Sequence, residues 1–229
     1  MPKLVEQFAV QLICQEQFHR MPWKNGKGET LELLCQQDEQ GIRWRISQAA
    51  VVEDGVFSDF TGMQRILVLL SGQGMQLTHQ FTESHNLTQP LDMARFAGFE
   101  HTVASLTQGP IEDLNIMVRQ TDTQAQVTAL VANANQSLTR QTDSYFYANE
   151  VTEIQLTSLL AAPTLEAPKQ SIKMPKDSLL ILAREALTPL PETLSVETTE
   201  ETKVEARPVH SLSVLTGSGV FIEISTTAQ

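Results

Sequence analysis

A nine-residue pattern that occurs twice restricts the fold of this chain more than any other feature of its sequence. Residues 69–77 read LLSGQGMQL and residues 214–222 read VLTGSGVFI, so a Gly-x-Gly turn after serine or threonine joins two apolar segments in each copy. Glycine permits the positive φ angles of tight turns, so each copy predicts a β-hairpin. Two related hairpins favour two similar β units over one, with a chance match as the alternative.

Strand patterns dominate the remaining sequence. Apolar and polar residues alternate over 42–47 and 113–119, and residues 65–70 form a short continuous apolar run typical of a buried strand. Three further β-rich segments occupy residues 145–148, 178–183 and 220–225. No long segment combines a helical apolar stripe with capping residues. The sequence therefore predicts an all-β fold with, at most, short helices.

The position of the second copy indicates how the units are assembled. Residue 222 is seven residues from the last residue, 229, so strands from earlier in the chain must complete its sheet. Two β-barrels packed closely, with or without exchange of strands, satisfy this requirement. We expect one barrel over residues 1–120 and another over 121–229. The acidic, threonine-rich residues 191–205 predict a solvated loop, with a charge-guarded strand edge as the alternative.

Charge and composition exclude several classes of function. The 229 residues carry a formal net charge of -11 and a sequence pI near 4.9, which argues against nucleic-acid binding and against binding to anionic membranes. No segment fits a signal-peptide core or approaches membrane-spanning length. Cys14 and Cys35 are expected to be free thiols rather than a disulfide. We therefore expect a cytoplasmic protein.

The motifs of common catalytic and cofactor sites are missing. The five histidines form no His-x-His pair with a nearby glutamate, so no metal is expected. Residues 25–30, NGKGET, lack the spacing of a phosphate-binding loop, and residues 72–77, GQGMQL, lack the third glycine of a dinucleotide fingerprint. No Gly-x-Ser-x-Gly occurs. The sequence therefore predicts no cofactor.

Positive and flexible residues gather at one place in this acidic chain. Residues 20–27 contain Arg20, Lys24 and Lys27 without an acidic residue, and Gly26 and Gly28 permit a turn whose amides can meet an anion. Two predicted strands also carry a polar face each, formed by Arg43, Arg45 and Ser47 and by Asp113, Asn115, Met117 and Arg119. Faces of this kind inside a barrel imply a hydrogen-bonded network or a polar ligand; the alternative is that they face solvent.

The residues also resemble a known family. RMPWKNGKGETLEL (20–33), WRISQAAV (44–51), the segment from DGVF to GMQL (54–77) and EDLNIMVR (112–119) occur in the order found in the HutD/Ves family, a branch of the cupin superfamily. Lys27 departs from the family pattern, which has a third glycine there. The resemblance implies a bicupin of two jelly-roll-like barrels and a role in histidine utilisation or in stress response. The metal ligands of ordinary cupins, His-x-His with glutamate, are missing.

The resemblance and the residues together predict a metal-free pocket for a small carboxylate such as N-formyl- or N-formimino-glutamate. Lys24, Arg45 and Arg65 supply positive charge, Asn25 and Asn115 supply amides, and Trp23 and Trp44 supply apolar walls. The complete predicted set of ligand-binding residues is Trp23, Lys24, Asn25, Gly26, Gly28, Thr30, Glu32, Trp44, Arg45, Ser47, Arg65, Asn115 and Met117. A core position for Trp23 with merely exposed lysines is the alternative.

Three classes of function remain open. A binding protein that senses or limits a pathway intermediate ranks first, because no acid–base or nucleophile set is visible. The second is a metal-independent hydrolase, isomerase or lyase with Glu32 as its general base. The third is a stress-related interaction module that uses residues 191–205. A homodimer is expected only from the general habits of soluble proteins.

Overall fold

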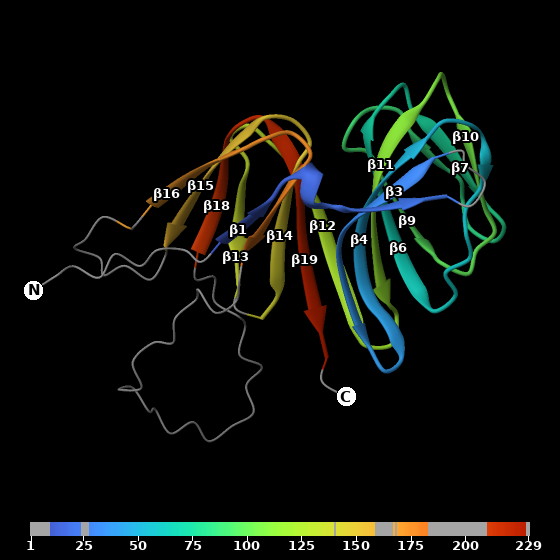
Figure 1. The fold of residues 1–229 in the computed structure, drawn as a ribbon, viewed down its shortest axis with the longest axis horizontal. Helices are drawn as coiled ribbons and strands as arrows, with labels where there is room; N and C mark the ends of the chain where they lie inside the picture. Colours follow the sequence, from blue (N-terminus) through green and yellow to red (C-terminus); the bar gives the residue numbers. More distant parts are fainter. Residues whose placement is uncertain are drawn as a thin grey trace, which may run out of the picture. The chain divides into compact units, whose positions relative to one another are not determined.

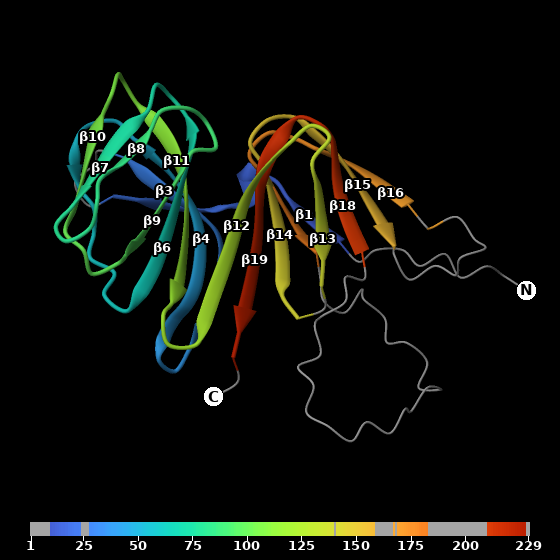
Figure 2. The ribbon, with the colours of Figure 1, turned by 180° about the vertical axis from the view of Figure 1, so that it is seen from behind.

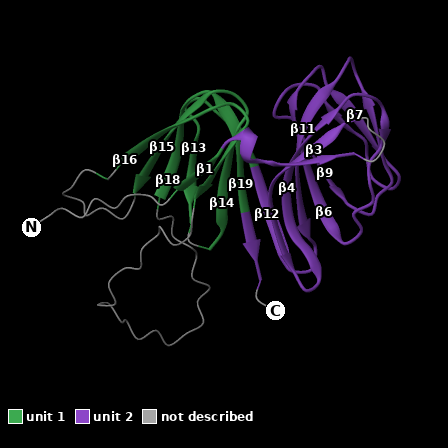
Figure 3. Ribbon diagram, in the orientation of Figure 1, with its two compact units in different colours: residues 1–13, 128–223 green, residues 14–127, 224–229 purple. Residues whose placement is uncertain are grey.

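The chain divides into two compact β units (Figure 3). A computed structural model describes residues 10–23, 28–139, 141–158, 167, 169–182 and 210–227. Unit 1 contains residues 1–13 and 128–223, and unit 2 contains residues 14–127 and 224–229. Each has two antiparallel sheets, so the all-β prediction is confirmed (Figure 1). The barrel boundary expected at residues 120/121 stays a prediction.

Unit 2 is built from a six-stranded and a four-stranded sheet. The larger sheet has the order β2 (His19–Pro22), β3 (Glu29–Asp38), β4 (Gly41–Val51), β11 (Ile111–Arg119), β6 (Met63–Ser71) and β9 (Met93–Ala97). The smaller has the order β5 (Gly55–Val56), β10 (Thr102–Leu106), β7 (Met75–His79) and β8 (His85–Leu87). Apolar side chains from both sheets form one core, among them Leu67, Leu77 and Phe96.

Unit 1 repeats this plan with a five-stranded and a four-stranded sheet. The larger has the order β1 (Val10–Ile13), β17 (Ser178–Leu182), β14 (Asp143–Ala148), β19 (Ser218–Thr226) and β12 (Thr123–Val131). The smaller has the order β13 (Asn135–Leu138), β18 (His210–Thr216), β15 (Thr152–Ser158) and β16 (Lys169–Met174). Figure 2 shows β12 and β19 side by side, and each contains residues of both units.

The repeated glycine pattern is confirmed as a structural repeat, but the predicted hairpins are wrong. Gly72 and Gly217 both have positive φ, 97° and 82°. The strands that each turn joins lie in different sheets, β6 and β7 in one copy and β18 and β19 in the other. The glycine turn therefore carries the chain from one sheet to the other. Turn residues indicate a sharp reversal, and they leave open whether the two strands then pair.

The remaining sequence predictions have mixed outcomes. All six predicted strand segments fall in strands, although the described part of the segment at 178–183 ends at Leu182. The described helical structure is the single 3₁₀ turn η1 (Gln15–Gln17), and no helix within the described ranges is long and apolar enough to cross a membrane. Cys14 and Cys35 are free thiols. The acidic residues 191–205 lie outside the described residues.

Candidate functional site

A cavity of about 630 Å³ lies within unit 2. One wall is the face of β4 and β11 that carries Arg45, Ser47, Asp113, Asn115 and Met117. The remaining lining comes from Arg65 of β6, Ala104 of β10, residues 21–23, Thr30 and most of the segment 52–60. The polar strand faces identified in the sequence thus reach the cavity in part, because Arg43 and Arg119 are absent from its lining and interact with Asp122 instead. The volume falls in the range typical of sites for small molecules, about 300–1,000 Å³.

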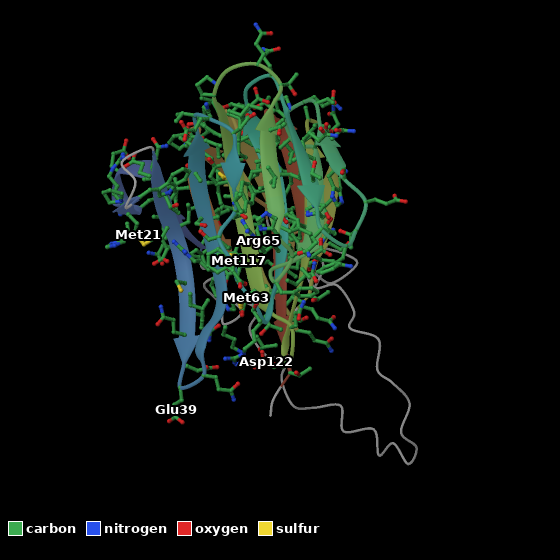
Figure 4. The ribbon with its side chains drawn as sticks, turned by 90° about the vertical axis from the view of Figure 1, so that its right-hand side faces the viewer. Met21, Glu39, Met63, Arg65, Met117 and Asp122 are labelled. Carbon is green, nitrogen blue, oxygen red and sulfur yellow. The ribbon has the colours of Figure 1, made fainter. Side chains whose placement is uncertain are left out.

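Strand register places two arginines beside one methionine at the cavity. Met117 of β11 is paired with Arg45 of β4 on one side and with Arg65 of β6 on the other. Figure 4 shows Arg65 and Met117 next to each other, with Asp122 farther along toward the end of the molecule marked by Glu39. Residues paired across a sheet have Cβ atoms about 4.5–5.5 Å apart. Arg45 and Arg65 therefore lie in one row across the sheet, and both side chains line the same cavity.

Arg65 is a buried cation in mostly apolar surroundings. Its residue is 5% exposed, and its guanidinium carbon lies 4.9, 5.3 and 5.0 Å from the ring centroids of Phe57, Phe60 and Phe96. Nη2 donates to Asn115 Oδ1 at 2.8 Å, Nη1 donates to the Ser58 carbonyl at 3.5 Å, and Nε has no hydrogen-bond partner. Burial lowers the pKa of Arg65 to about 10, with Asp113 acting in the opposite direction. Such a guanidinium gains free energy from an additional anionic acceptor.

Asn115 connects Arg65 to a buried carboxyl group. Asn115 Nδ2 donates to Asp113 Oδ1 at 2.6 Å, while Asn115 Oδ1 accepts from Arg65. Asp113 is 1% exposed. Burial raises the pKa of Asp113 to about 7, against the lowering effects of Arg65 and of the hydrogen bond from Asn115. The Asp113 carboxyl therefore titrates near neutral pH, so the cavity contains an acidic group that can be neutral or charged.

The second arginine has a different electrostatic environment. Arg45 Nε lies 2.8 Å from Glu32 Oε2, and Arg45 Nη2 lies 3.7 Å from Met21 Sδ. Glu32 is not part of the cavity lining. Because this ion pair satisfies much of the charge on Arg45, Arg65 is the stronger candidate anchor for an anion.

Trp23 and Gly28 close the edge of the cavity near β2 and β3. The Trp23 indole donates to Thr30 Oγ1 at 2.9 Å, and the Trp23 backbone N–H donates to the Gly28 carbonyl at 2.9 Å. A Cβ at residue 28 would lie 3.0 Å from the Trp23 ring and 3.0 Å from the Ala50 carbonyl oxygen. Residue 28 is therefore glycine because the indole and β4 approach its backbone closely.

The structure brings part of the predicted ligand-binding set together. Seven of its members line the cavity: Trp23, Thr30, Arg45, Ser47, Arg65, Asn115 and Met117. Gly28 supports Trp23, and Glu32 holds Arg45. Trp44 is buried and is absent from the lining, and its indole donates to Gln36 Oε1. Lys24, Asn25 and Gly26 lie outside the described residues.

Two kinds of lining residue were missing from the predicted set. Asp113 has the same strand face as Asn115 and Met117, so its place could have been read from the alternation over 113–119. The same alternation places Trp44 on the face opposite Arg45. Phe57 and Phe60 come from an irregular segment after β5, and no local sequence pattern indicates that they surround Arg65.

Unit 1 has apolar residues at two positions that correspond to this polar network. Ser71 of β6 pairs with Glu112 next to a register shift, and in unit 1 Thr216 of β18 pairs with Glu153 next to the same kind of shift. By this correspondence Asp113 matches Ile154 and Asn115 matches Leu156. Both of the latter are fully buried in an apolar cluster with residues such as Phe146 and Phe221. By the same register Arg65 corresponds to His210, which is also buried and polar, so the two units differ in polarity at the positions of Asp113 and Asn115.

The residues at the cavity do not fit a metal ion. Within the described ranges, no three or more His, Cys, Asp or Glu residues are grouped so that they could hold one. His79 is absent from the lining, and its Nε2 and Nδ1 lie 2.9 Å from His85 Nδ1 and Thr102 Oγ1. The cavity instead offers guanidinium and amide groups, which bind anions and polar organic groups.

Comparisons with known proteins agree with this architecture. The HutD family model matches residues 15–204. An uncharacterized 21.2 kDa protein in the hutC 3' region of Pseudomonas putida is 39% identical over 110 residues, 47% of this chain and 57% of that protein. Protein Ves of Escherichia fergusonii is 36% identical over 107 residues, 46% of this chain and 56% of that protein. The chain thus covers a little over half the length of either relative.

Among solved structures, the chain is similar to HutD from Pseudomonas fluorescens SBW25, described as a formate condition. The TM-score is 0.71 at 25% identity, over 96% of this chain and 100% of that chain.

Proposed function

This chain belongs to the HutD family of bicupin proteins, which is linked to histidine utilisation, and from that membership and the unit 2 cavity we propose that it is a metal-free binding protein for a small carboxylate. In this role it senses or limits an intermediate of histidine breakdown. N-formyl-glutamate and N-formimino-glutamate are the candidate ligands. The formate condition of the Pseudomonas fluorescens structure makes formate the simplest probe.

The proposal is carried by one observation, the incompletely satisfied guanidinium of Arg65 inside a cavity. Three phenylalanine rings surround the Arg65 guanidinium, its Nη2 donates to Asn115 Oδ1 and its Nη1 to the Ser58 carbonyl, and its Nε has no hydrogen-bond partner. A desolvated charge costs free energy unless it is paired. A carboxylate matches the planar fork of a guanidinium and can accept two hydrogen bonds from it. Arg65 is therefore the proposed anchor for the ligand carboxylate.

The remaining lining fits a ligand with an apolar stem and a second polar group. Trp23, Val51 and Ala104 provide apolar surface, and Ser47 and Thr30 provide hydroxyl groups. Asn115 already uses its oxygen and one of its N–H groups within the protein. Its second N–H and second lone pair are what remain for a formyl or formimino group.

Thermal unfolding with candidate ligands, with and without a chelator, tests the proposal. A ligand at a hundred times its dissociation constant adds about 2.7 kcal/mol to the free energy of unfolding, which raises the melting temperature visibly. We expect a chelator-insensitive rise with formate and a larger one with N-formyl- or N-formimino-glutamate. Absence of any rise, together with no heat of binding in calorimetry, would refute the binding role and favour an interaction module.

A metal-independent enzyme is the second candidate, and Asp113 is the observation that favours it. A carboxyl with a pKa of about 7 beside an arginine can donate or accept a proton near neutral pH. Glu32, the base first expected, is instead paired with Arg45. Turnover of a bound intermediate that is lost in Asp113→Asn while binding persists would favour this candidate over a sensor.

A further inference from the structure

Arg65 already interacts with one carboxyl group inside the cavity. The hydrogen-bond chain runs from Arg65 Nη2 to Asn115 Oδ1, at 2.8 Å, and from Asn115 Nδ2 to Asp113 Oδ1, at 2.6 Å. All three side chains are buried and line the same cavity. When Asp113 is ionised, its carboxylate and the carboxylate of a ligand compete for interaction with the positive charge of Arg65. Two carboxylates sharing one site repel each other, so one of them tends to take a proton.

We propose that Asp113 takes up one proton from solvent when a carboxylate binds at Arg65, and that the neutral Asp113 carboxyl then donates a hydrogen bond to the bound anion. This inference rests on the proposed function and adds to its site a hydrogen-bond donor for the bound carboxylate. Asp113 Oδ1 accepts from Asn115, which leaves Oδ2 to carry the proton. The ligand keeps its charge, and no covalent bond forms or breaks in it.

The physical reason for proton uptake is the loss of a stabilising charge. Burial raises the pKa of Asp113, and Arg65 opposes that rise. A bound anion offsets the positive charge of Arg65, so that charge no longer lowers the pKa of Asp113. The pKa of Asp113 then rises further, and the carboxyl is protonated over a pH range in which it is partly ionised in the free protein. The two equilibria are therefore linked, each favouring the other.

Among the described residues, the other charged groups near the cavity interact with other partners or are exposed. On β3 and β4, Glu32 and Arg45 form an ion pair at 2.8 Å. Before β5, Glu53 and Asp54 are exposed, and Asp54 Oδ1 accepts from the Leu106 N–H at 2.7 Å.

Two further groups complete the surroundings. On β7, His79 packs against the Phe96 ring, which also contacts Arg65. Glu112, the neighbour of Asp113 on β11, accepts from Ser71 and is absent from the cavity lining. Of the described carboxyl groups, only Asp113 combines full burial with a hydrogen-bond chain to Arg65.

Calorimetry in two buffers counts the protons. The full chain is titrated with formate and with glutarate in HEPES and in Tris at pH 8, and in MES and in Bis-Tris at pH 5.5. The two buffers of each pair differ in ionisation enthalpy, so the difference in heat gives the number of protons taken up per ligand. We expect a value approaching one at pH 8 and approaching zero at pH 5.5, where Asp113 is already neutral. The affinity should fall up to about tenfold for each pH unit above 7, because each binding event requires one proton.

Two variants distinguish proton uptake by Asp113 from proton uptake by the neighbouring acidic residue. Asp113→Asn keeps the shape and should bind either probe without proton uptake and with no pH dependence above 7. Glu112→Gln alters the adjacent acid on β11 and should keep the wild-type proton count. Saturable binding that Arg65→Gln weakens, but whose heat is the same in both buffers at pH 8, would overturn this inference and leave the binding role intact. No binding of either probe at any pH would overturn both.

Discussion

Arg45 and Arg65 are paired with the same residue, Met117, from opposite sides of β11. Their guanidinium groups nevertheless differ in charge environment, because Glu32 lies 2.8 Å from Arg45 while Arg65 reaches its nearest acid only through Asn115. A carboxylate bound beside Met117 would lie between Arg45, whose charge is offset by Glu32, and Arg65, which interacts with Asp113 through Asn115. The proposed site is thus asymmetric, with Arg65 as its anchor.

Arg65→Gln should weaken binding of formate and of N-formyl-glutamate by about 10- to 100-fold. The expectation follows from the loss of a charge-assisted hydrogen bond, which is worth about 1.5–3 kcal/mol. Isothermal titration calorimetry measures the change. Arg95→Gln is the matched control, because Arg95 is an exposed residue on β9 that is absent from the cavity lining. Equal affinity in both variants would exclude Arg65 as the anchor.

Glu32→Gln should strengthen carboxylate binding by a few fold, because it releases Arg45 from its ion pair. An enzyme that uses Glu32 as general base would instead lose turnover without a gain in affinity. Parallel measurements of affinity and of ligand breakdown on the same variant therefore separate the two functions. Arg45→Ala should act in the opposite direction and weaken binding.

Much of the fold could be predicted from the sequence because strand periodicity and the glycine repeat are local signals. The alternation at 42–47 correctly placed Arg45 and Ser47 on one face, away from Trp44. What could not be predicted is decided by contacts between distant segments. The pairing of β7 with β10 rather than with β6 is one example, and the rings around Arg65 are another.

Arg119 shows the limit of reading a polar strand face. It continues the alternation of Asp113 and Asn115, yet it lies beyond the cavity, where Nε and Nη2 donate to Asp122 at 3.0 and 2.7 Å and Nη1 donates to Asp38 at 2.8 Å. One strand face thus serves a cavity at its middle and a structural ion-pair network at its end. Sequence alternation gives the face, and only the fold gives the surroundings.

Arg119→Met should lower the melting temperature by several degrees at neutral pH, since Asp38 and Asp122 lose their shared partner. Arg119 holds the pKa of Asp38 at about 2, below its ordinary value of 3.8. This contribution is present above pH 4 and is lost as pH falls toward 2. The difference in melting temperature between Arg119→Met and the wild-type protein should therefore be smaller at pH 3. Arg20→Gln, which breaks only the exposed pair with Glu29, should change little.

Asp113→Asn should raise the free energy of unfolding above pH 7 by up to about 4 kcal/mol. Asp113 has a folded-state pKa of about 7, raised from 3.8, so the folded protein binds more protons than the unfolded chain between these values. Wild-type stability should therefore fall as pH rises from 4 to 7, and the variant should lack that fall. Urea unfolding across this range measures it. Parallel curves for the two proteins would show that Asp113 is ionised without cost.

Replacing the polar network of unit 2 with apolar residues should abolish binding and raise the free energy of unfolding. Ile154 and Leu156 are fully buried at the positions that correspond to Asp113 and Asn115. We expect the triple variant Arg65→Met, Asp113→Ile, Asn115→Leu to unfold at about 1–4 kcal/mol higher free energy and to bind no carboxylate, because apolar packing replaces desolvated charges. Arg65→Met alone should lose binding without that gain, since Asp113 and Asn115 stay buried with one partner fewer. A triple variant less stable than both the single variant and wild type would show instead that the network holds the barrel together.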